Sequence, residues 1–460
     1  MKFFLMKRGC FPGISFAFLI FLSSISPVGA QNRIILHNAK IYTMADDASV
    51  NEAILVEGNR IIALGINEAI LSMEDVNTDV FDLQGRTIFP GFIDPHTHLF
   101  GQAFGMGYDL DLIQQLALEV GVTSAAEMHV SEEQTEYYRQ YAQSDNMRFR
   151  LYLYLNFNDS CGNVWGSWYE KYPPNVDIGP RLRVNGVKIF SEKSLCGANG
   201  AEPVFSNKLL KFFTPLGLAQ WGNTQLLFSF DELKKIILQA TDQGYQVAVH
   251  AIGDVGIETT LKAIESVLKS SQDKKTNRYR HMVMHNHFLT DDLLHKYARN
   301  NIIALIEPPT TCQANNYAEG VGERNMKYFK RVDDLVETGA HVAIDSDWPI
   351  VTQLLNPMNK LRAIVTGKAG TCPSDINLQR VSVFEGLKMM TSEAAYALHC
   401  EDHLGSLEIG KLADLVVLSQ DPFEVVPDNI RDIQVLLTMV DGKIEFLRDN
   451  DGDSIPDILE

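Results

Sequence analysis

The chain has 460 residues, 45% hydrophobic and 21% charged, a composition typical of a globular protein with a large core. That length accommodates one large barrel and a smaller companion domain. The formal net charge of −18 argues against nucleic acid or an anionic membrane as the main partner, and no apolar run after the N-terminal segment is long enough to span a bilayer.

The first thirty residues have the layout of a secretory signal. A basic start with Lys2, Lys7 and Arg8 precedes an apolar run at 14–22, and small residues follow up to Ala30. The pattern predicts that residues 1–30 are a signal peptide cleaved after about Ala30. The apolar run is short for a membrane anchor, so we expect a periplasmic or secreted protein with no membrane span in the mature chain.

The cysteines outside this signal are widely scattered. They are Cys161, Cys196, Cys312, Cys372 and Cys400. Without a Cys-x-x-Cys pair, a cysteine-based metal site is not expected. An oxidising compartment permits a disulfide, and the odd number leaves at least one thiol unpaired within the chain.

Two regions rich in short strands lie at opposite ends of the mature chain. In residues 31–90, "RIILHNAKIYTM" and "NEAILVEGNRIIALG" predict strands joined by polar or Gly-containing bends, and the same texture returns in residues 403–447. We therefore expect one composite β-sandwich domain that closes only when both chain ends meet.

Residues 91–402 have the alternation of apolar strands and helical stretches that indicates parallel βα units. Eight strands are expected in "TIFPGFIDPHTHL", "VTSAAEMHV", "RFRLYLYLN", "RVNGVKIFS", "YQVAVHAIG", "RHMVMHNHF", "NIIALIEPP" and "HVAIDSDWP". Helical patterns separate most of them, as in "SFDELKKIILQATDQG", where Ser229 is a candidate cap and Gly244 a stop. The fold class is therefore predicted as α/β, a (β/α)8 TIM barrel joined to the β-sandwich domain.

Six polar residues share a position at or near the end of a candidate strand. They are His96, His98, Lys188, His250, His285 and Asp347. The C-terminal strand ends of such a barrel form the active-site floor, and residues two apart on a strand share a face. Because imidazole and carboxylate ligands suit zinc, we expect a divalent ion that activates water for hydrolysis.

Several motifs carry a family resemblance from about Asn38 to Phe446. They are "GFIDPHTHL", "VKIF", "HAIGD", "RHMVMH", "SDWP" and "LGSLEIGKLADLVVL". With these motifs the chain resembles the family-3 branch of the amidohydrolase superfamily, which includes N-substituted formamide deformylase-like enzymes. The resemblance implies a metal-dependent hydrolase with one or two divalent ions that cleaves a non-peptide C–N bond in an amide or N-substituted formamide-like small molecule.

The same resemblance implies roles for individual residues. His96, His98, His250 and His285 match metal ligands of the family. Lys188 matches a lysine that can be carboxylated and bridge two ions; an unmodified lysine paired with an acid such as Glu127 is the open alternative, and it implies a single ion. Asp347 matches a ligand that also acts as general base, taking a proton from the attacking water and passing it to the leaving nitrogen.

The sequence departs from the family pattern at three places. "VKIF" is followed by Ser191-Glu192-Lys193-Ser194 in place of an Asp-Gly-Ser stretch, Met284 stands where a glutamate usually precedes the strand-six histidine, and a long insertion after Leu99 is missing. These departures leave the substrate open. A deaminase, an ester or phosphoester hydrolase on the same metal site, and a non-catalytic binding barrel stay as alternatives.

Residues beside the main cluster have competing interpretations. His287 shares a face with His285, so it either contacts substrate or faces solvent. Asp345 is expected to be a hydrogen-bonded structural carboxylate, and Glu127 and His129 are expected to support the site. The aromatic segment at 161–174 either lines the barrel mouth or packs on the surface.

The acidic tail at 448–460 carries oxygen ligands at the alternating spacing of a calcium loop. They are Asp449, Asp451, Asp453, Asp457 and Glu460. The glycine is misplaced for an EF-hand, and the tail is more similar to a single acidic thrombospondin type-3 repeat. Calcium binding and a disordered acidic tail are both compatible with the sequence. Homo-oligomerisation is left open.

Overall fold

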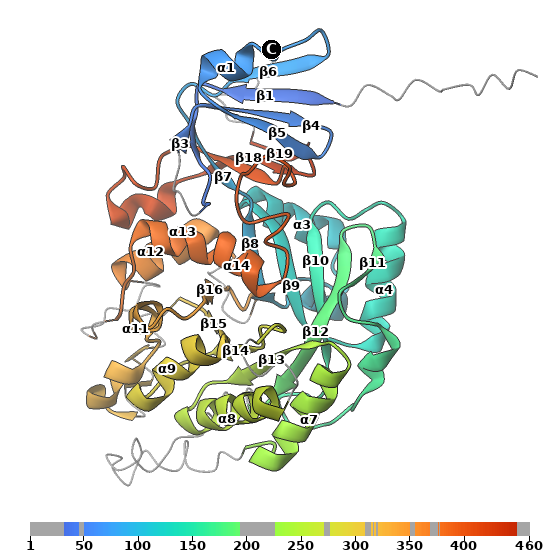
Figure 1. Ribbon diagram of the computed structural model, residues 1–460, viewed down its shortest axis with the longest axis vertical. Coiled ribbons are helices and arrows are strands. Elements are labelled where there is room, and N and C mark those ends of the chain that lie inside the picture. The colour runs from blue at the N-terminus through green and yellow to red at the C-terminus, as the bar shows by residue number, and fades with distance from the viewer. Residues whose placement is uncertain are drawn as a thin grey trace, which may run out of the picture.

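The computed structural model describes most of the chain. The described residues are 32–45, 50–193, 226–270, 277–308, 314–315, 317–318, 321–349, 355–368, 376 and 378–448. Within them the strands form three sheets, with a barrel below a smaller β domain (Figure 1). The signal-peptide and acidic-tail predictions fall outside the described residues. No helix in the described ranges is long and apolar enough to cross a membrane.

Eight parallel strands form the barrel, in the order predicted from the sequence. They are β8 (Phe92–Thr97), β9 (Val122–Val130), β10 (Arg150–Asn156), β12 (Leu182–Phe190), β13 (Gln246–Ala251), β14 (Met282–His285), β15 (Ile303–Ile306) and β16 (Val342–Ile344). A further strand, β11 (Val176–Gly179), pairs antiparallel with the beginning of β12. The predicted (β/α)8 barrel is confirmed.

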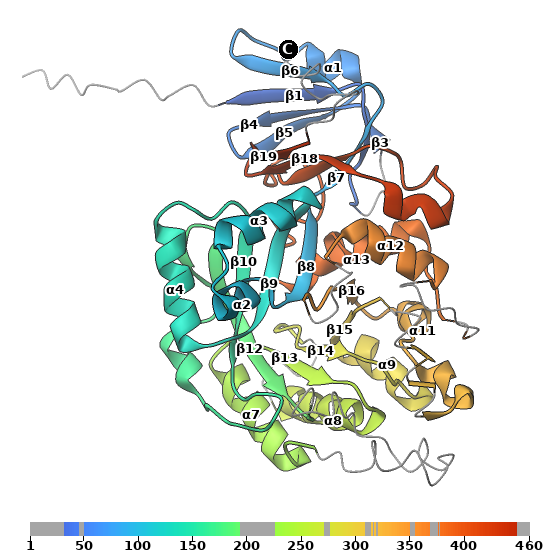
Figure 2. The same ribbon diagram turned by 180° about the vertical axis from the view of Figure 1, so that it is seen from behind.

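Helices lie around the outside of these strands (Figure 2). They are α2 (Leu99–Met106), α3 (Leu110–Glu119), α4 (Glu132–Gln143), α7 (Phe230–Asp242), α8 (Asp254–Ser270), α9 (Asp291–Asn300), α11 (Val332–Glu337), α12 (Pro357–Thr366), α13 (Val383–Met389) and α14 (Ser392–Ala397). Short 3-10 turns cover Trp168–Lys171, Glu323–Tyr328 and Pro427–Asp432. Helix α7 begins with the predicted Ser229 cap, whose side chain accepts from the Glu232 backbone, and the chain turns at Gly244 with φ +92°.

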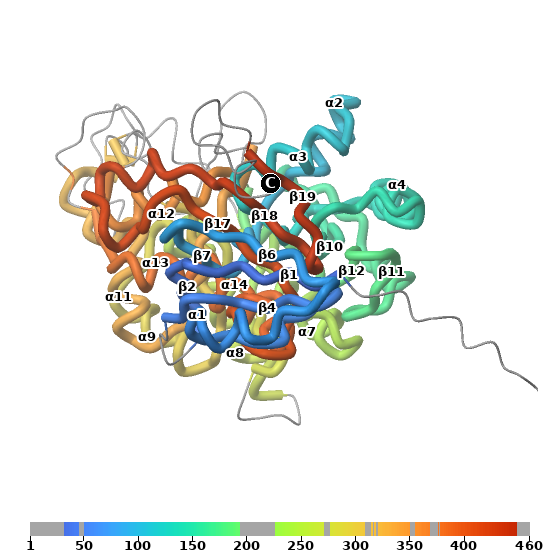
Figure 3. Tube along the Cα trace, turned by 90° about the horizontal axis from the view of Figure 1, so that it is seen from above, coloured from blue at the N-terminus to red at the C-terminus, as the bar shows by residue number. Residues whose placement is uncertain are grey.

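Two further sheets form the β domain. One contains β1 (Arg33–His37), β4 (Ala53–Glu57), β5 (Arg60–Gly65) and β6 (Thr78–Asp82), with α1 (Asn67–Leu71) beside it. The other combines β2 (Lys40–Tyr42), β3 (Val50–Asn51) and β7 (Thr87–Pro90) with β17 (Leu415–Leu418), β18 (Val435–Val440) and β19 (Lys443–Leu447). Figure 3 shows the C-terminal strands alongside the N-terminal ones.

A shared apolar core joins the two sheets of this domain. Ile34 and Val56 of the first sheet belong to the same buried cluster as Ile88, Val417 and Met439 of the second. Strand β17 pairs with β7, so residues more than 300 positions apart share one ladder. The composite β-sandwich predicted from both chain ends is confirmed.

The barrel closes between its first and last strands without a regular ladder. The Asp347 backbone N–H donates to the His96 carbonyl at 3.0 Å, and the His98 N–H donates to the Trp348 carbonyl at 2.8 Å. The seam therefore holds the two predicted histidines of β8 beside the predicted aspartate that follows β16.

Candidate metal centre

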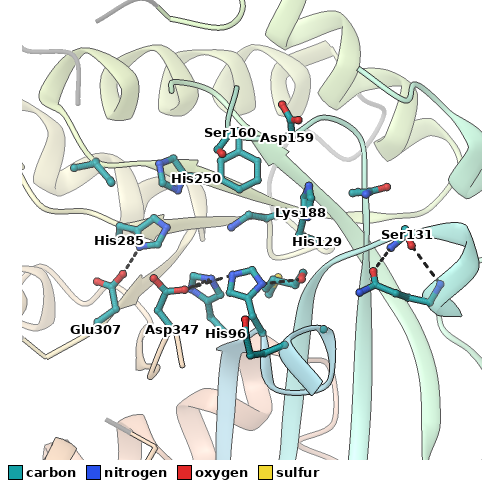
Figure 4. A pocket seen from close by; sticks show the side chains of 18 of the residues that line it. His96, His129, Ser131, Asp159, Ser160, Lys188, His250, His285, Glu307 and Asp347 are labelled. Atoms are coloured by element: carbon teal, nitrogen blue, oxygen red, sulfur yellow. Dashed lines mark hydrogen bonds and ion pairs between the residues drawn. The ribbon is translucent and has the colours of Figure 1, made fainter. Parts of the chain in front are cut away.

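A cavity of about 630 Å³ lies at the carboxyl ends of the barrel strands, and all six predicted strand-end residues line it (Figure 4). The six are His96, His98, Lys188, His250, His285 and Asp347. They come from five different strands and the segments just after them. The barrel thus brings together side chains up to about 250 positions apart in the sequence.

His96 and His98 converge on the Asp347 carboxylate. The His96 Nε2 lies 3.2 Å and the His98 Nε2 3.5 Å from Asp347 Oδ1. His96 is fully buried near the end of β8, whereas His98 precedes α2 and keeps a quarter of its side chain exposed. Their ligand atoms and that carboxylate oxygen are close enough together to hold one ion.

The turn that carries His98 is fixed by Glu127. This buried carboxylate accepts hydrogen bonds from the Phe100 and Gly101 backbone N–H groups at 2.9 and 2.8 Å, at the beginning of α2. The His98 Nδ1 lies 3.1 Å from the Met128 carbonyl, and donating there leaves Nε2 for the cavity. Burial raises the pKa of Glu127 to about 7. Glu127 therefore supports the site as expected and is engaged with α2.

His250 and His285 complete a group of closely spaced imidazoles. Their ring centroids are 4.4 Å apart, and His285 lies 5.1 Å from His96. Burial holds the pKa of His96 and of His250 well below the usual range, so both rings are neutral. Neutral imidazole nitrogens are the form that binds a metal.

Several of these buried nitrogens have no hydrogen-bond partner among the described residues. They are both ring nitrogens of His96 and the Nε2 of His250. His96 Nδ1 lies 3.5 Å from the buried Asp345 carboxyl, whereas His96 Nε2 lies 3.2 Å from Asp347, which lines the cavity. Buried polar atoms are nearly always satisfied, so the unpaired Nε2 atoms of His96 and His250 mark a position that a cation would fill. The donor set of imidazoles and a carboxylate fits zinc or another divalent transition metal.

Lys188 is buried in the same cavity without a carboxylate partner in the described part of the chain. Its Nζ lies 2.9 Å from Met284 Sδ and 4.9 Å from the centre of the Phe190 ring. Burial lowers its pKa to about 8, although Asp347 and other carboxylates oppose that shift. The expected alternative, an ion pair with Glu127, is not formed. The Lys188 amine instead contacts the sulfur of Met284, one of the departures from the family pattern.

Glu307 was not identified from the sequence, yet it lines the cavity beside His285. It follows β15 and forms a short hydrogen bond with His285 Nδ1. Burial alone would raise its pKa, but Lys330 and the neighbouring imidazoles hold it well below the usual range. A polar residue at the end of the "NIIALIEPP" strand was the available signal.

His287 and Asp345, two residues with competing interpretations from the sequence, are both buried. His287 is buried and lines the cavity, with Tyr317 Oη 2.9 Å from Nδ1 and Glu307 Oε2 3.3 Å from Nε2, so the solvent-facing alternative is wrong. Asp345 is buried, but the expected hydrogen bonds to its carboxyl oxygens are absent among the described residues. Burial and nearby carboxylates raise its pKa well above the usual range, which favours the protonated form.

The mouth of the cavity has an aromatic side. Trp165 and Phe190 flank His129, with ring centroids 5.5 and 5.6 Å away, and all three line the cavity. The segment at 161–174 thus contributes Trp165 to the mouth, while Tyr169 is buried in the core. Cys161 at its start is disulfide-bonded, and Cys400 is a free, buried thiol.

Comparison with known proteins agrees with this geometry. The chain matches the amidohydrolase family over residues 113–446. It is 30% identical over 265 residues to the protein LONG AFTER FAR-RED 3 of Arabidopsis thaliana, covering 57% of this chain and 43% of that protein. It is 26% identical over 226 residues to N-substituted formamide deformylase of Arthrobacter pascens, covering 48% and 40%. The matches span less than half the length of both relatives.

A solved structure with a similar fold is an uncharacterized metal-dependent hydrolase from Pyrococcus furiosus. It superposes with a TM-score of 0.68 at 18% identity, covering 85% of this chain and all of that one. At that identity the likeness concerns the arrangement of the barrel and the β domain.

Proposed function

This chain belongs to the amidohydrolase family, and from that premise we propose that it is an exported metal-dependent hydrolase that cleaves the C–N bond of an amide or N-substituted formamide. The observation that carries the proposal is the group of buried, neutral imidazoles with orphaned nitrogens around Asp347. The name of the Arthrobacter relative, a formamide deformylase, supports a C–N bond as the target.

The residues that would hold the metal are the six that line the cavity floor. His96, His98, His250, His285 and Asp347 supply nitrogen and oxygen ligands, and a carboxylated Lys188 would add a bridge between two ions. A divalent ion bound there, which we propose to be zinc, supplies a water that is nucleophilic at neutral pH. The amide carbonyl of the substrate would lie over these ligands, at the open end of the barrel.

Asp347 is placed to move the proton that the reaction requires. Its carboxylate lines the cavity within 3.5 Å of the His96 and His98 Nε2 atoms, and its backbone N–H donates to the His96 carbonyl. A carboxylate in that position accepts a proton from the attacking water and returns it to the nitrogen that leaves.

Export is the second part of the proposal. The basic and apolar start with small residues up to Ala30 supports a cleaved signal. The disulfide at Cys161 supports it independently, because structural disulfides form and persist in oxidising compartments. N-terminal sequencing of the protein recovered from the periplasm or medium is expected to begin near Gln31, and a full-length chain retained in the cytoplasm would contradict export.

Metal analysis and substrate screening on one mature preparation test the hydrolase proposal. We expect bound zinc and turnover of N-substituted formamides or simple amides in a panel that also holds esters, phosphoesters and amidines. We predict that Asp347→Asn retains metal but loses activity by about 10²–10⁴-fold, since the proton acceptor is removed. Asp428→Asn, a half-exposed carboxylate outside the cavity, is the control.

The outcomes separate the alternatives. Preferential turnover of amidines, esters or phosphoesters would replace the amide assignment with a deaminase or an ester hydrolase on the same site. A metal-free native protein without turnover would favour a binding barrel. Full activity of Asp347→Asn would contradict the role given to that carboxylate.

A further inference from the structure

A group of buried polar side chains lies beside His285. Glu307, 2% exposed, bonds His285 Nδ1 through Oε1. Its Oε2 lies 3.3 Å from His287 Nε2 and accepts from Lys330 Nζ at 3.0 Å. Figure 4 shows the Glu307 side chain directed at the His285 ring. The carboxylate thus has three donors around its two oxygens.

Lys330 belongs to this group as the counter-charge. It is 1% exposed, and its Nζ also donates to the Glu307 carbonyl at 2.9 Å. Its backbone N–H donates to the His287 carbonyl at 2.8 Å. The buried Lys330 ammonium donates to both the backbone carbonyl and the side-chain carboxylate of Glu307. It therefore stabilises the charged form of Glu307, which would be costly to bury without a partner.

The direction of every hydrogen bond in the group follows from that charge. A carboxylate only accepts, so His285 Nδ1–H and His287 Nε2–H must donate to Glu307. A neutral imidazole carries one N–H, so His287 Nδ1 accepts from the Tyr317 hydroxyl 2.9 Å away. A His285 ring that donates from Nδ1 to Glu307 presents Nε2 as its metal-binding nitrogen.

We propose that Glu307, with Lys330 behind it, is a positioning residue that fixes the ring and tautomer of His285 so that Nε2 binds the ion. His287 and Tyr317 hold the carboxylate in place from the other side. The inference rests on the proposed function only in treating the imidazole cluster as a metal site. It assigns His287 to the support of Glu307, in place of the substrate contact that the sequence suggested.

Direct metal ligation by Glu307 is the competing possibility. Ligand atoms of His96, His285 and Glu307 all lie within 4.8 Å of one another. However, Glu307 Oε2 already has two donors, His287 and Lys330, and Oε1 has His285 Nδ1, so only one acceptor position, on Oε1, is left for an ion. The geometry therefore favours orientation of His285 over direct ligation.

Zinc affinity measured by competition with a chromophoric chelator tests the proposal without reference to turnover. Glu307→Gln is expected to weaken zinc binding by about 10–100-fold, the usual effect of losing such a partner. Because that variant leaves Lys330 buried without its counter-charge, Glu307→Gln combined with Lys330→Met is the second variant, and it should show the same loss with a cooperative thermal transition. Tyr317→Phe, which keeps both imidazole bonds to Glu307, should cost less.

Asp414→Asn is the matched control, since it removes the carboxylate of a buried ion pair with Arg150 outside the cavity. Its zinc affinity should equal that of the wild type. The cobalt(II) absorption spectrum separates positioning from ligation: Glu307→Gln should keep the wild-type coordination number.

Two results would overturn the proposal. One is unchanged zinc affinity in both folded Glu307 variants, and the other is a changed coordination number in the cobalt spectrum, which would make Glu307 a ligand. A wild type that binds zinc tightly but turns over no compound of the panel would contradict the proposed function alone and leave this inference standing.

Discussion

At the scale of single residues, we propose that Lys188 determines how many ions the site holds. Its pKa of about 8 means that a sizeable part of the amine is neutral near neutral pH, and only the neutral amine reacts with CO₂ to give a carbamate. We predict that the wild type purified with bicarbonate binds two equivalents of zinc and that Lys188→Met binds one. Elemental analysis after dialysis measures this, and equal metal content in both proteins would show that Lys188 is unmodified.

The residues around Lys188 also show where prediction from the sequence reaches its limit. The six strand-end residues could be placed in one cavity because the barrel brings the carboxyl ends of its strands together. Glu307 also lies at a strand end, but its charge in the buried site depends on the ion pair with Lys330, which lies in a later segment of the chain. The spacing of Glu307 and Lys330 in the sequence does not reveal that they pair. Likewise, the raised pKa of Asp345 comes from burial and from nearby carboxylates that are distant in the sequence, so the sequence did not predict it.

At the scale of elements, a buried ion pair supports the closing seam between β8 and β16 beside its backbone hydrogen bonds. Asp94 accepts from the Ser346 backbone at 3.1 Å and from Lys360 of α12 at 2.8 Å, and both side chains are almost completely buried. We predict that Lys360→Met destabilises the protein by about 3–5 kcal/mol, because Asp94 is left as an unpaired buried charge. Urea denaturation measures the loss, and the double variant with Asp94→Asn should recover part of it.

The beginning of β8 illustrates what the apolar pattern could not reveal. "TIFPGFIDPHTHL" predicts one strand, but Thr87–Pro90 pairs with β17 in the β domain and Phe92–Thr97 joins the barrel. The break falls at Gly91, where an added Cβ would lie 2.2 Å from the Thr123 hydroxyl oxygen. A continuous apolar run has no period that marks such a change of sheet. The prediction of eight barrel strands is still correct, because the break at Gly91 precedes the first barrel strand.

At the scale of the whole molecule, charged groups connect the C-terminal segment of the β domain to the barrel. Arg150 of β10 pairs with Asp414 and Asp441 of the C-terminal segment, and Arg181 pairs with Asp441 at 2.8 Å. The sequence predicted that the ends meet, since neither β-rich region alone could cover its apolar face. It could not predict these contacts, because each joins residues about 260–290 positions apart.

Acid stability of the whole fold should depend on His281, which joins the barrel to its helices away from the cavity. Its Nδ1 accepts from the Val247 N–H at 3.1 Å, and its Nε2 lies 3.1 Å from Thr241 Oγ1 of α7. Burial lowers its pKa to about 3, so the folded protein keeps this ring neutral while the unfolded chain binds a proton below its ordinary value near 6.5.

These two pKa values determine how the free energy of unfolding changes with pH. The stabilisation is fully present above about pH 6.5 and is lost as the pH falls toward 3, because the unfolded state then binds more protons. We predict that the free energy of unfolding falls more steeply with acid in the wild type than in His281→Asn, by up to about 1.4 kcal/mol per pH unit. Comparing the two proteins cancels the effect of pH on any bound metal, since the metal ligands are the same in both. His295→Asn, at an exposed histidine of α9, should keep the wild-type slope, and parallel curves for wild type and His281→Asn would show that burial of this ring does not govern the acid limit.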